Sequence, residues 1–451
     1  MADFAPSEQK MRAAGLPELA IRAFRRNFEL LVAGDNGTLS RREIEPVEDV
    51  PVFEASPALR RTGEAALPRA VVIKLNGGLG TTMGMTQAKS LLPVKDGLTF
   101  LDIIALQIRA LGERSGVRVP LVLMNSFRTR ADSLAALAVH GELSGALAPD
   151  FMQHKVPRLL ASDRSPVAWP QEPEHEWCPP GHGDLYTALV TSGALAAMLG
   201  AGIRYAFISN ADNLGAALDL DLLGWFAESG APFAMEVKRR SEADKKGGHI
   251  ARTKSGRLTL RETAQCPDDE VASFQDVKLY KFFNTNNLWI DLRALERALA
   301  ENGGVLPLPY IRNEKNVDPR DARSPKVLQL ETAMGAAISC FDGARAIQVP
   351  AHRFAPVKNT GDLLAIRSDA YVLGPDYRIL PAPGGPGDQL VIDLDPAYFK
   401  SVDQLDARTP HGAPSLIRAR RLTVRGDVTF AKGAVVEGEV RIEAGQGETR
   451  S

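Results

Sequence analysis

The residues best suited to chemistry lie in a glycine-rich segment at positions 75–84, Leu-Asn-Gly-Gly-Leu-Gly-Thr-Thr-Met-Gly, with Lys89 shortly after it. Its four glycines let backbone N–H groups approach phosphate oxygens without a Cβ in the way. Lys89 can supply the compact charge that a triphosphate needs. The spacing is not that of a Walker A loop, because Lys89 follows Gly84 by five residues. Met83 takes the third glycine position of G-x-G-x-x-G. The segment predicts phosphate binding, with a tight strand-to-helix turn as the alternative.

Two further segments carry a histidine or a carboxylate at candidate ligand positions. Residues 178–184 read Cys-Pro-Pro-Gly-His-Gly-Asp, a turn preset by proline and glycine from which His182 can project. Residues 209–215 read Ser-Asn-Ala-Asp-Asn-Leu-Gly and place Asp212 directly after a predicted strand. One carboxylate there can hold Mg²⁺, which prefers one or two protein oxygens together with phosphate oxygens. A structural histidine and a helix N-cap are the alternative interpretations.

Amide side chains and a second lysine complete the candidate chemistry. Residues 282–289 read Phe-Phe-Asn-Thr-Asn-Asn-Leu-Trp, and residues 353–360 read Arg-Phe-Ala-Pro-Val-Lys-Asn-Thr. Amides donate and accept hydrogen bonds at once, which suits sugar hydroxyls. Lys358 lies near a rigid proline and is a second candidate phosphate contact. Turn formation and an ordinary surface lysine are the alternatives for these two segments.

Short apolar runs that alternate with helical periods must position these residues. Strands are predicted at 71–75, 121–124, 205–208, 233–237 and 288–290, with one helix over 101–111 and another over 185–196. This alternation predicts an α/β fold with a largely parallel sheet and helices on both faces. Ligands of such folds bind beyond the carboxyl ends of the strands. The glycine segment and Asp212 follow predicted strands directly.

Length and composition narrow the class of protein. The 451 residues are enough for two or three domains. Because 54 basic residues nearly balance 55 acidic ones, no nucleic-acid or membrane partner is expected. Cys178, Cys266 and Cys340 form no C-x-x-C pair, so we expect neither a disulfide framework nor a zinc ribbon, and a cytoplasmic location. The N-terminal residues lack an apolar signal region, and the longest uncharged stretch, 188–203, favours a buried helix.

The C-terminal tail has a repeat of its own. Two sets of apolar residues recur every six positions: Leu422, Val428, Ala434 and Val440, and Val424, Phe430, Val436 and Ile442. Two interleaved six-residue periods predict a parallel β-helix, with a β-meander as the alternative. We expect an N-terminal helical, peripheral segment over 1–69, a catalytic domain over 70–370 and a β-helix domain over 371–451. None of the chemistry-bearing motifs lies beyond Lys358, so deletion of residues 420–451 is expected to affect stability or association rather than activity.

Together these segments resemble the UTP–glucose-1-phosphate uridylyltransferase family of the eukaryotic type. The matching stretches, in the family's order, are LNGGLGTTMGMTQAKSLLPVKDGLTFLDI, PPGHGDLYTAL, ISNADNLGA, GGHIARTKSGRLTLRETAQ, FFNTNNLWI, LQLETAMGAAI and RFAPVKNTGDLL. They span about residues 71–371. Thr-Gln-Ala-Lys stands where many members have Gly-Pro-Lys, and Ala211 where Ile or Ser is commoner. Neither departure removes a group expected to do chemistry.

The resemblance implies a Rossmann-like, GT-A-like nucleotidyltransferase, in which helices flank a mixed sheet, with a short C-terminal left-handed parallel β-helix. It also implies an enzyme that converts UTP and glucose 1-phosphate to UDP-glucose and pyrophosphate with Mg²⁺. By matching position, Lys89, Lys358 and Asp212 would be catalytic, with Asp212 as the metal ligand. The remaining positions would bind substrate: Leu75, Gly77, Gly78, Gln153 and Gly181 around uracil and ribose, Asn210 near the reacting phosphates, and His182, Gly248, Glu262, Asn284 and Asn286 around the sugar phosphate.

The expected mechanism is a direct in-line displacement, in which an oxygen of the sugar phosphate attacks the α-phosphorus of UTP. Such a nucleophile is already charged, so positioning and charge neutralisation are the protein's tasks. A pyrophosphorylase for another sugar, such as an N-acetylhexosamine 1-phosphate, is the nearest alternative. A non-catalytic nucleotide-sugar-binding protein is another, and the glycine spacing argues against a nicotinamide-dependent dehydrogenase. A homo-oligomer through the C-terminal domain stays open.

Overall fold

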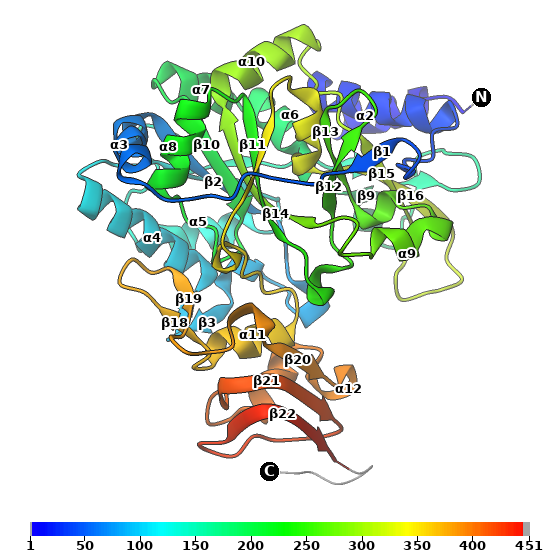
Figure 1. The fold of residues 1–451 in the computed structure, drawn as a ribbon. Coiled ribbons are helices and arrows are strands. Elements are labelled where there is room, and N and C mark those ends of the chain that lie inside the picture. Colours follow the sequence, from blue (N-terminus) through cyan, green and yellow to red (C-terminus); the bar gives the residue numbers. More distant parts are fainter. Residues whose placement is uncertain (1, 445–451) are drawn as a thin grey trace. The chain divides into compact units, whose positions relative to one another are not determined.

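A computed structural model describes residues 2–444, which form two compact units (Figure 1). The first unit contains residues 2–71, 146–208 and 220–349, and the second contains residues 72–145, 209–219 and 350–444. Because the chain passes repeatedly from one unit to the other, residues that are far apart in sequence meet within each unit.

The sheet of the first unit is organised around the long strand β14 (Phe282–Asp291). This strand pairs antiparallel with β10 (Tyr205–Asn210), β11 (Phe233–Arg239) and β12 (His249–Thr253). β11 also pairs parallel with β17 (Arg345–Gln348). The other strands are β1 (Ile44–Pro46), β6 (Asp150–Met152), β7 (Val156–Pro157), β8 (Leu159–Leu160), β9 (Trp177–Cys178), β13 (Leu258–Arg261), β15 (Tyr310–Asn316) and β16 (Lys326–Thr332).

Helices of the first unit pack through apolar faces and, at one point, through glycines. Gly63 and Gly224 let α3 and α8 lie side by side, because a Cβ at either would fall within 2 Å of a carbonyl oxygen of the other helix (Figure 1). The α-helices are α1 (Ala5–Ala13), α2 (Glu18–Val32), α3 (Pro57–Ala66), α6 (Leu185–Thr191), α7 (Ala194–Gly200), α8 (Leu220–Ser229), α9 (Val271–Phe274) and α10 (Leu292–Glu301). The 3₁₀ helices are η1 (Leu67–Arg69), η4 (Pro173–Glu176), η5 (His182–Asp184), η6 (Glu242–Asp244), η7 (Thr263–Gln265), η8 (Asp268–Glu270) and η9 (Met334–Cys340).

Most of β2 (Ala70–Asn76), which is buried along its whole length, belongs to the second unit. β2 pairs parallel with β5 (Leu121–Asn125), so that Asn76 lies opposite Asn125. The other strands of the second unit are β3 (Pro93–Lys95), β4 (Leu98–Thr99), β18 (Tyr371–Leu373), β19 (Ile379–Pro381), β20 (Val391–Leu394), β21 (Ser415–Arg425) and β22 (Val435–Glu443). Its helices are α4 (Phe100–Ser115), α5 (Arg130–Ala138), α11 (Thr360–Arg367), α12 (Pro396–Phe399), α13 (Val402–Arg408), η2 (Thr81–Met83), η3 (Lys89–Leu91), η10 (Ala351–Arg353) and η11 (Gly387–Gln389).

The C-terminal strands β20, β21 and β22 pair parallel in sequence order (Figure 1, orange to red). Leu422 lies opposite Val440, and Val424 lies opposite Ile442, so the register advances by eighteen residues, which is three of the six-residue periods. An antiparallel β-meander is therefore excluded for this pair. These residues belong to a core cluster that also contains Met83 of the glycine segment.

Two expectations about local structure are wrong. The predicted single helix over 185–196 is two helices, because Gly193 adopts a left-handed conformation (φ 76°) between α6 and α7. The sheet is mixed rather than largely parallel, because β14 runs antiparallel to β10, β11 and β12. The predicted strands at 71–75, 121–124, 205–208, 233–237 and 288–290 are all present.

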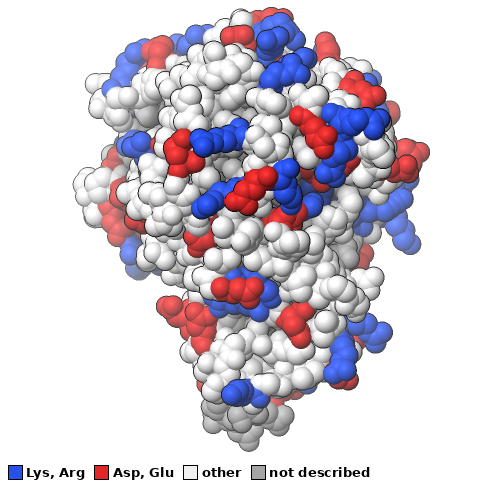
Figure 2. All heavy atoms as spheres, turned by 90° about the vertical axis from the view of Figure 1, so that its left-hand side faces the viewer, with Lys and Arg blue, Asp and Glu red and all other residues white. Residues whose placement is uncertain are grey.

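Surface charge agrees with the composition. On the face drawn in Figure 2, basic and acidic side chains are interspersed. Within residues 2–444, no helix combines the length and apolar character that crossing a membrane requires.

Candidate active site

The charged candidates meet in the second unit, at the carboxyl ends of strands. Lys89 Nζ donates to Asp212 Oδ2 at 2.6 Å, and both side chains are largely removed from solvent. Lys89 is fixed beside the glycine segment because its backbone N–H donates to Gly78 O at 3.0 Å. The pair therefore joins the two motifs that the sequence placed after separate strands.

Lys358 is held close to Asp212 through the backbone. The N–H of Val357 donates to Asp212 O at 3.2 Å, which places the lysine one residue beyond this contact. Lys358 itself is exposed, and its Nζ lies 5.6 Å from the centre of the Phe354 ring. Asp212 and Lys89 thus lie close to the backbone of Lys358. Together with Leu75, Gly77, Gly78 and Asn210, we call these residues the phosphate group, after the role predicted for them.

The glycine segment leaves room for a ligand. Gly78 is exposed, and a Cβ built on it would meet no atom within 4 Å. Gly80 (φ 67°) and Gly84 (φ 75°) bracket η2 in left-handed conformations that other residues adopt at a cost. Leu75 O accepts the N–H of Ala211 at 3.0 Å, which joins the segment to the Asp212 loop. The arrangement offers backbone next to a lysine and a carboxylate.

The remaining candidates lie in the first unit, and we call them the sugar group after the role predicted for most of them: Gln153, Gly181, His182, Gly248, Glu262, Asn284 and Asn286. Gln153 Nε2 donates to Gly181 O at 3.0 Å. Gly181 has a φ of 81°, and a Cβ there would lie 2.4 Å from Thr332 O. Only glycine fits this turn without displacing backbone. The residues predicted to contact uracil and ribose therefore belong to both named sets. Gln153 and Gly181 are in the sugar group, and Leu75, Gly77 and Gly78 are in the phosphate group.

His182 is a neutral hydrogen-bonding group in this setting. Its Nδ1 accepts the backbone N–H of Met334 at 2.9 Å, so the ring proton resides on Nε2. Burial lowers the pKa of His182 to about 4. At neutral pH its Nε2–H can donate to an acceptor without bringing a charge.

Gly248, Glu262 and Asn284 lie in contact with one another. A Cβ on Gly248 would fall 2.5 Å from Glu262 Oε2, so glycine is required for this approach. The N–H of Asn284 donates to Gly248 O at 3.1 Å. Asn284 Nδ2 donates to Asn286 Oδ1, and the N–H of Asn286 donates back to Asn284 Oδ1, both at 2.9 Å.

Asn286 adopts a strained conformation. Its φ is +57°, and it lies where the register between β11 and β14 shifts, so that Thr285 and Asn286 form a bulge. Bulges and left-handed non-glycine residues concentrate at functional sites, where they re-aim side chains. The bulge accounts for the run of amides, which sequence reasoning could also interpret as a turn.

The residues of the phosphate group have the chemistry to hold a divalent cation. Among residues 2–444, no cluster of three or more His, Cys, Asp or Glu side chains could hold a metal ion. Asp212 supplies one carboxylate beside a segment that is open to phosphate oxygens. Mg²⁺ suits such a set, because it is commonly bound by one or two carboxylates with substrate phosphates and water.

Two carboxylates that sequence reasoning missed hold these groups in place. Asp362 Oδ2 accepts the N–H of Lys358 at 2.7 Å. Burial raises the pKa of Asp362, and the charges of Lys358 and Lys89 oppose that rise. Its position three residues after Asn359, as in a capping box, was the available signal.

The second carboxylate, Glu236, is fully buried on β11, opposite Asn287 of β14. It accepts from Asn287 Nδ2 at 3.0 Å and from Trp289 Nε1 at 2.9 Å. Its only sequence signal is an acidic residue inside an apolar run.

Comparisons with known proteins identify the family of this chain. The family model described as UTP–glucose-1-phosphate uridylyltransferase matches residues 21–437. The UTP–glucose-1-phosphate uridylyltransferase of Hordeum vulgare is 42% identical over 386 residues, which cover 85% of this chain and 79% of that protein. The enzyme of the same name from Saccharomyces cerevisiae is 38% identical over 383 residues, covering 84% and 75%.

Solved structures similar to this chain come from enzymes of the same kind. A mutant UDP-glucose pyrophosphorylase from Leishmania major, in complex with UDP-glucose, matches with a TM-score of 0.92 at 43% identity, covering 100% of this chain and 96% of that chain. The UDP-glucose phosphorylase from Trypanosoma brucei matches with a TM-score of 0.90 at 44% identity, covering 99% and 96%. Since the family model spans most of the sequence and the relatives exceed 30% identity over more than four-fifths of it, the chain belongs to the UTP–glucose-1-phosphate uridylyltransferase family.

Proposed function

We propose that this chain is an enzyme that joins UTP to glucose 1-phosphate and releases UDP-glucose and pyrophosphate. The observation that carries the proposal is the contact between Lys89 and Asp212 at 2.6 Å, beside the glycine segment, in a chain of this family. Backbone donors and a lysine can bind the phosphates of a nucleoside triphosphate, and a carboxylate beside them can hold the accompanying Mg²⁺.

The residues of the phosphate group bring two mutually repelling anions together. Lys89 and Lys358 oppose the charge on the phosphates, and the glycine segment offers backbone donors next to them. Asp212 and the phosphates of UTP would hold Mg²⁺, which would neutralise charge on the leaving pyrophosphate. The sugar phosphate attacks the α-phosphorus directly, because a phosphate monoester is already a charged nucleophile.

The sugar group orients the other substrate through hydrogen-bonding contacts. Asn284, Asn286 and the Nε2–H of His182 offer donors and acceptors to hydroxyls, and Glu262 accepts from them. A hydroxyl loses its water on binding, so each must find a partner in the site. By matching position, Gln153 and Gly181 would contact the nucleobase.

The C-terminal strands are proposed to be the start of a left-handed parallel β-helix. The parallel pairing of β21 with β22 and the eighteen-residue register support it, since one coil of such a helix takes about three hexads. We further propose that the open edge of β22 is where a second copy could assemble. A cytoplasmic location, which the three unpaired cysteines favour, belongs to the same set of proposals.

The purified chain tests the proposal directly. UDP-glucose formation is measured with UTP, Mg²⁺ and a panel of sugar 1-phosphates, and then with ATP in place of UTP. We expect the highest kcat/KM for glucose 1-phosphate and UTP. Comparable kcat/KM for N-acetylglucosamine 1-phosphate would indicate the sister enzyme, and absence of product would indicate a binding protein. Robust exchange of labelled pyrophosphate into UTP without sugar phosphate would contradict direct displacement.

A further inference from the structure

Lys74 is a fully buried lysine in the middle of β2, three residues before Gly77. Its side chain is 2% exposed. Nζ donates to Ser209 Oγ at 2.7 Å and to Ala216 O at 2.5 Å. A buried ammonium is costly unless hydrogen bonds compensate it, so these contacts need a structural or functional reason.

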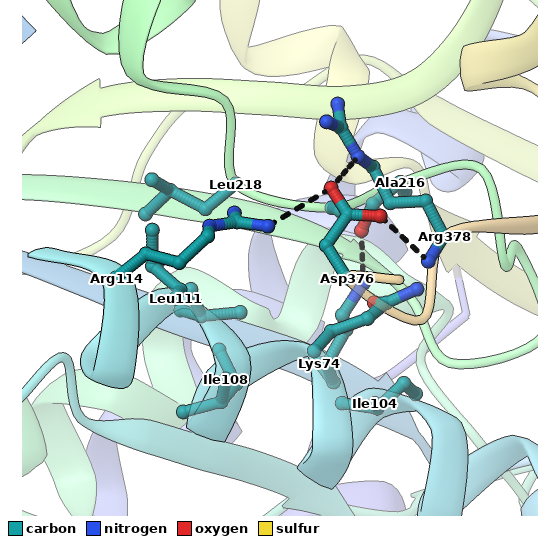
Figure 3. A pocket seen from close by; sticks show the side chains of 12 residues that line it. Lys74, Ile104, Ile108, Leu111, Arg114, Ala216, Leu218, Asp376 and Arg378 are labelled. Atoms are coloured by element: carbon teal, nitrogen blue, oxygen red, sulfur yellow. Dashed lines mark hydrogen bonds and ion pairs between the residues drawn. The ribbon is translucent and has the colours of Figure 1, made fainter. Parts of the chain in front are cut away.

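The two acceptors lie at the two ends of the loop that carries Asp212. Ser209 is the last but one residue of β10, which ends at Asn210, and Ala216 follows Gly215 at the other end of the loop. One ammonium therefore ties both ends of this loop to the strand that leads into the glycine segment. Figure 3 shows Lys74 reaching Ala216 from β2, with α4 below it.

The other side of the same loop is fixed to the segment that carries Lys358. Asn213 Oδ1 accepts the N–H of Ala355 at 2.9 Å, and Arg353 donates to Ala217 O at 3.1 Å. A Cβ on Gly215 would fall 2.2 Å from His352 O, so the two segments are in close contact. A displacement of the loop would therefore be transmitted to Asp212 and to Lys358 together.

The surroundings of Lys74 indicate an anchor rather than a ligand contact. The cavity beside it has a volume of about 20 Å³, room for a single water. At its outer wall, Asp376 accepts from Arg378 Nε at 2.6 Å and pairs with Arg114 at 3.2 Å (Figure 3). Asp376 is engaged by both arginines, whereas Ser209 Oγ and Ala216 O, which accept from the ammonium, belong to the loop.

We propose that Lys74 is a positioning residue: its buried ammonium clamps the ends of the 209–216 loop and thereby sets where Asp212 meets Lys89 and the phosphates. This inference rests on the proposed function, because it assigns Lys74 to the phosphate step of that reaction. It predicts that loss of the ammonium weakens Mg²⁺ use and turnover and leaves sugar binding intact, since the sugar group lies in other segments.

The test compares three variants of the full chain. Lys74→Met keeps the side-chain length and removes the donors. Ser209→Ala removes one acceptor and is the milder change, should Lys74→Met fail to fold. Lys95→Met is the matched control, because Lys95 Nζ also donates to a carbonyl, Ser368 O at 2.6 Å, but outside the loop. Thermal unfolding, Mg²⁺ titrations of kcat, KM for glucose 1-phosphate, and amide hydrogen exchange over residues 209–217 are measured on each.

For Lys74→Met we expect kcat to fall about 10- to 100-fold, the scale of a small misplacement of catalytic groups. The Mg²⁺ concentration for half-maximal rate should rise, KM for glucose 1-phosphate should change less than about threefold, and exchange should increase at 209–217. Ser209→Ala should show the same pattern at smaller size, and Lys95→Met none of it. An unchanged Mg²⁺ requirement, or exchange that increases uniformly along the chain, would overturn the assignment.

The exchange measurement also separates this inference from the proposed function. If the wild-type chain formed no UDP-glucose while Lys74→Met still loosened 209–217 selectively, the reaction would be wrong and the anchor correct. If the wild type formed UDP-glucose and neither variant altered the loop or the Mg²⁺ response, the anchor would be wrong and the reaction correct.

Discussion

The phosphate group and the sugar group differ in the kind of side chain from which they are built. Lys89, Asp212 and Lys358 bring charges, and two of these neutralise each other through a 2.6 Å contact. His182, Asn284 and Asn286 bring neutral donors and acceptors that bond to one another and to backbone. Phosphates repel each other, so a site that binds two of them needs positive charge. Sugar hydroxyls need hydrogen-bond partners, and uncharged side chains lose less hydration free energy than charged ones when they are buried.

The two groups also differ in how firmly they are fixed. The sugar group is built on backbone that only certain residues can adopt, such as the left-handed Asn286 and the crowded Gly181 and Gly248. The phosphate group has an exposed Gly78 and an exposed Lys358, whose places are set by neighbouring backbone. We therefore expect substitutions in the phosphate group to act on kcat and substitutions in the sugar group to act on KM.

The largest effect should follow Asp212→Asn, which removes the carboxylate and keeps its size. We expect turnover to fall by at least about 10³-fold with the fold intact, because cation binding and charge balance are lost together. Asp219→Asn, a carboxylate near Arg378 in the same unit, is the control. Wild-type activity of Asp212→Asn at limiting Mg²⁺ would remove Asp212 from the metal site.

Lys89→Met and Lys358→Met should each lower kcat/KM by about 10² to 10³, roughly 3 to 4 kcal/mol, as for loss of one preorganised donor. Lys89 contacts Asp212, so the effects of Lys89→Met and Asp212→Asn should not be independent. The double variant should lose less transition-state stabilisation than the sum of the two single losses. Steady-state kinetics on all variants measures both. A change under about threefold would reassign the lysine concerned to the surface.

Deletion of residues 420–451 tests whether the phosphate group depends on the tail. The sequence predicts retained activity, but the structure leads us to expect less. Leu422, Val424 and Phe430 share a core cluster with Met83 of the glycine segment, so their loss should loosen it. Residues 445–451 lie outside the described part of the chain.

We expect the free energy of unfolding of the truncated chain to fall by more than about 3 kcal/mol, and specific activity in the folded fraction to fall with it. Urea unfolding measures the free energy, and sedimentation and kinetics on the same sample measure association and specific activity. As point controls, Leu422→Ala should lower stability by about 2 to 4 kcal/mol and the exposed Val435→Ala by less than about 0.5. Full specific activity in the truncated chain would support the prediction from the sequence that activity does not depend on residues 420–451.

In the sugar group, Asn284→Ala should raise KM for glucose 1-phosphate about tenfold, the cost of one or two hydrogen bonds, and change kcat less than about threefold. Asn302→Ala, directly after α10, is the matched control because its amide donates to Ala298 O at the end of its own helix. A fall in kcat at unchanged KM would contradict the division between the two groups.

The smallest effect concerns His182 and pH. Its native pKa of about 4 lies below the ordinary value of 6.5, so the unfolded chain binds a proton that the native chain does not. The stability that neutral His182 contributes is complete above about pH 6.5 and is lost as pH falls toward 4. In urea unfolding at several pH values, His182→Gln should flatten this loss relative to wild type, and exposed His411→Gln should not. Equal slopes for His182→Gln and wild type would show that His182 titrates normally.

The amino-acid sequence by itself determined the local elements and the chemistry-bearing segments. Runs such as residues 71–75 form buried strands because several apolar residues in a row must leave water, whatever their partners. The six-residue periods put Leu422 and Val440 at equivalent positions of the repeat, and these two residues lie opposite each other on β21 and β22. The family match also rests on contiguous motifs.

The tertiary structure alone decided the partners. The direction of β14 against its neighbours and the break at Gly193 depend on contacts and conformations that residue type leaves open. The contact of Lys89 with Asp212 and the burial of Lys74 join residues more than 120 positions apart. A lysine in a sequence carries no sign of its acceptor, because a long flexible side chain finds a partner only after the backbone has been placed.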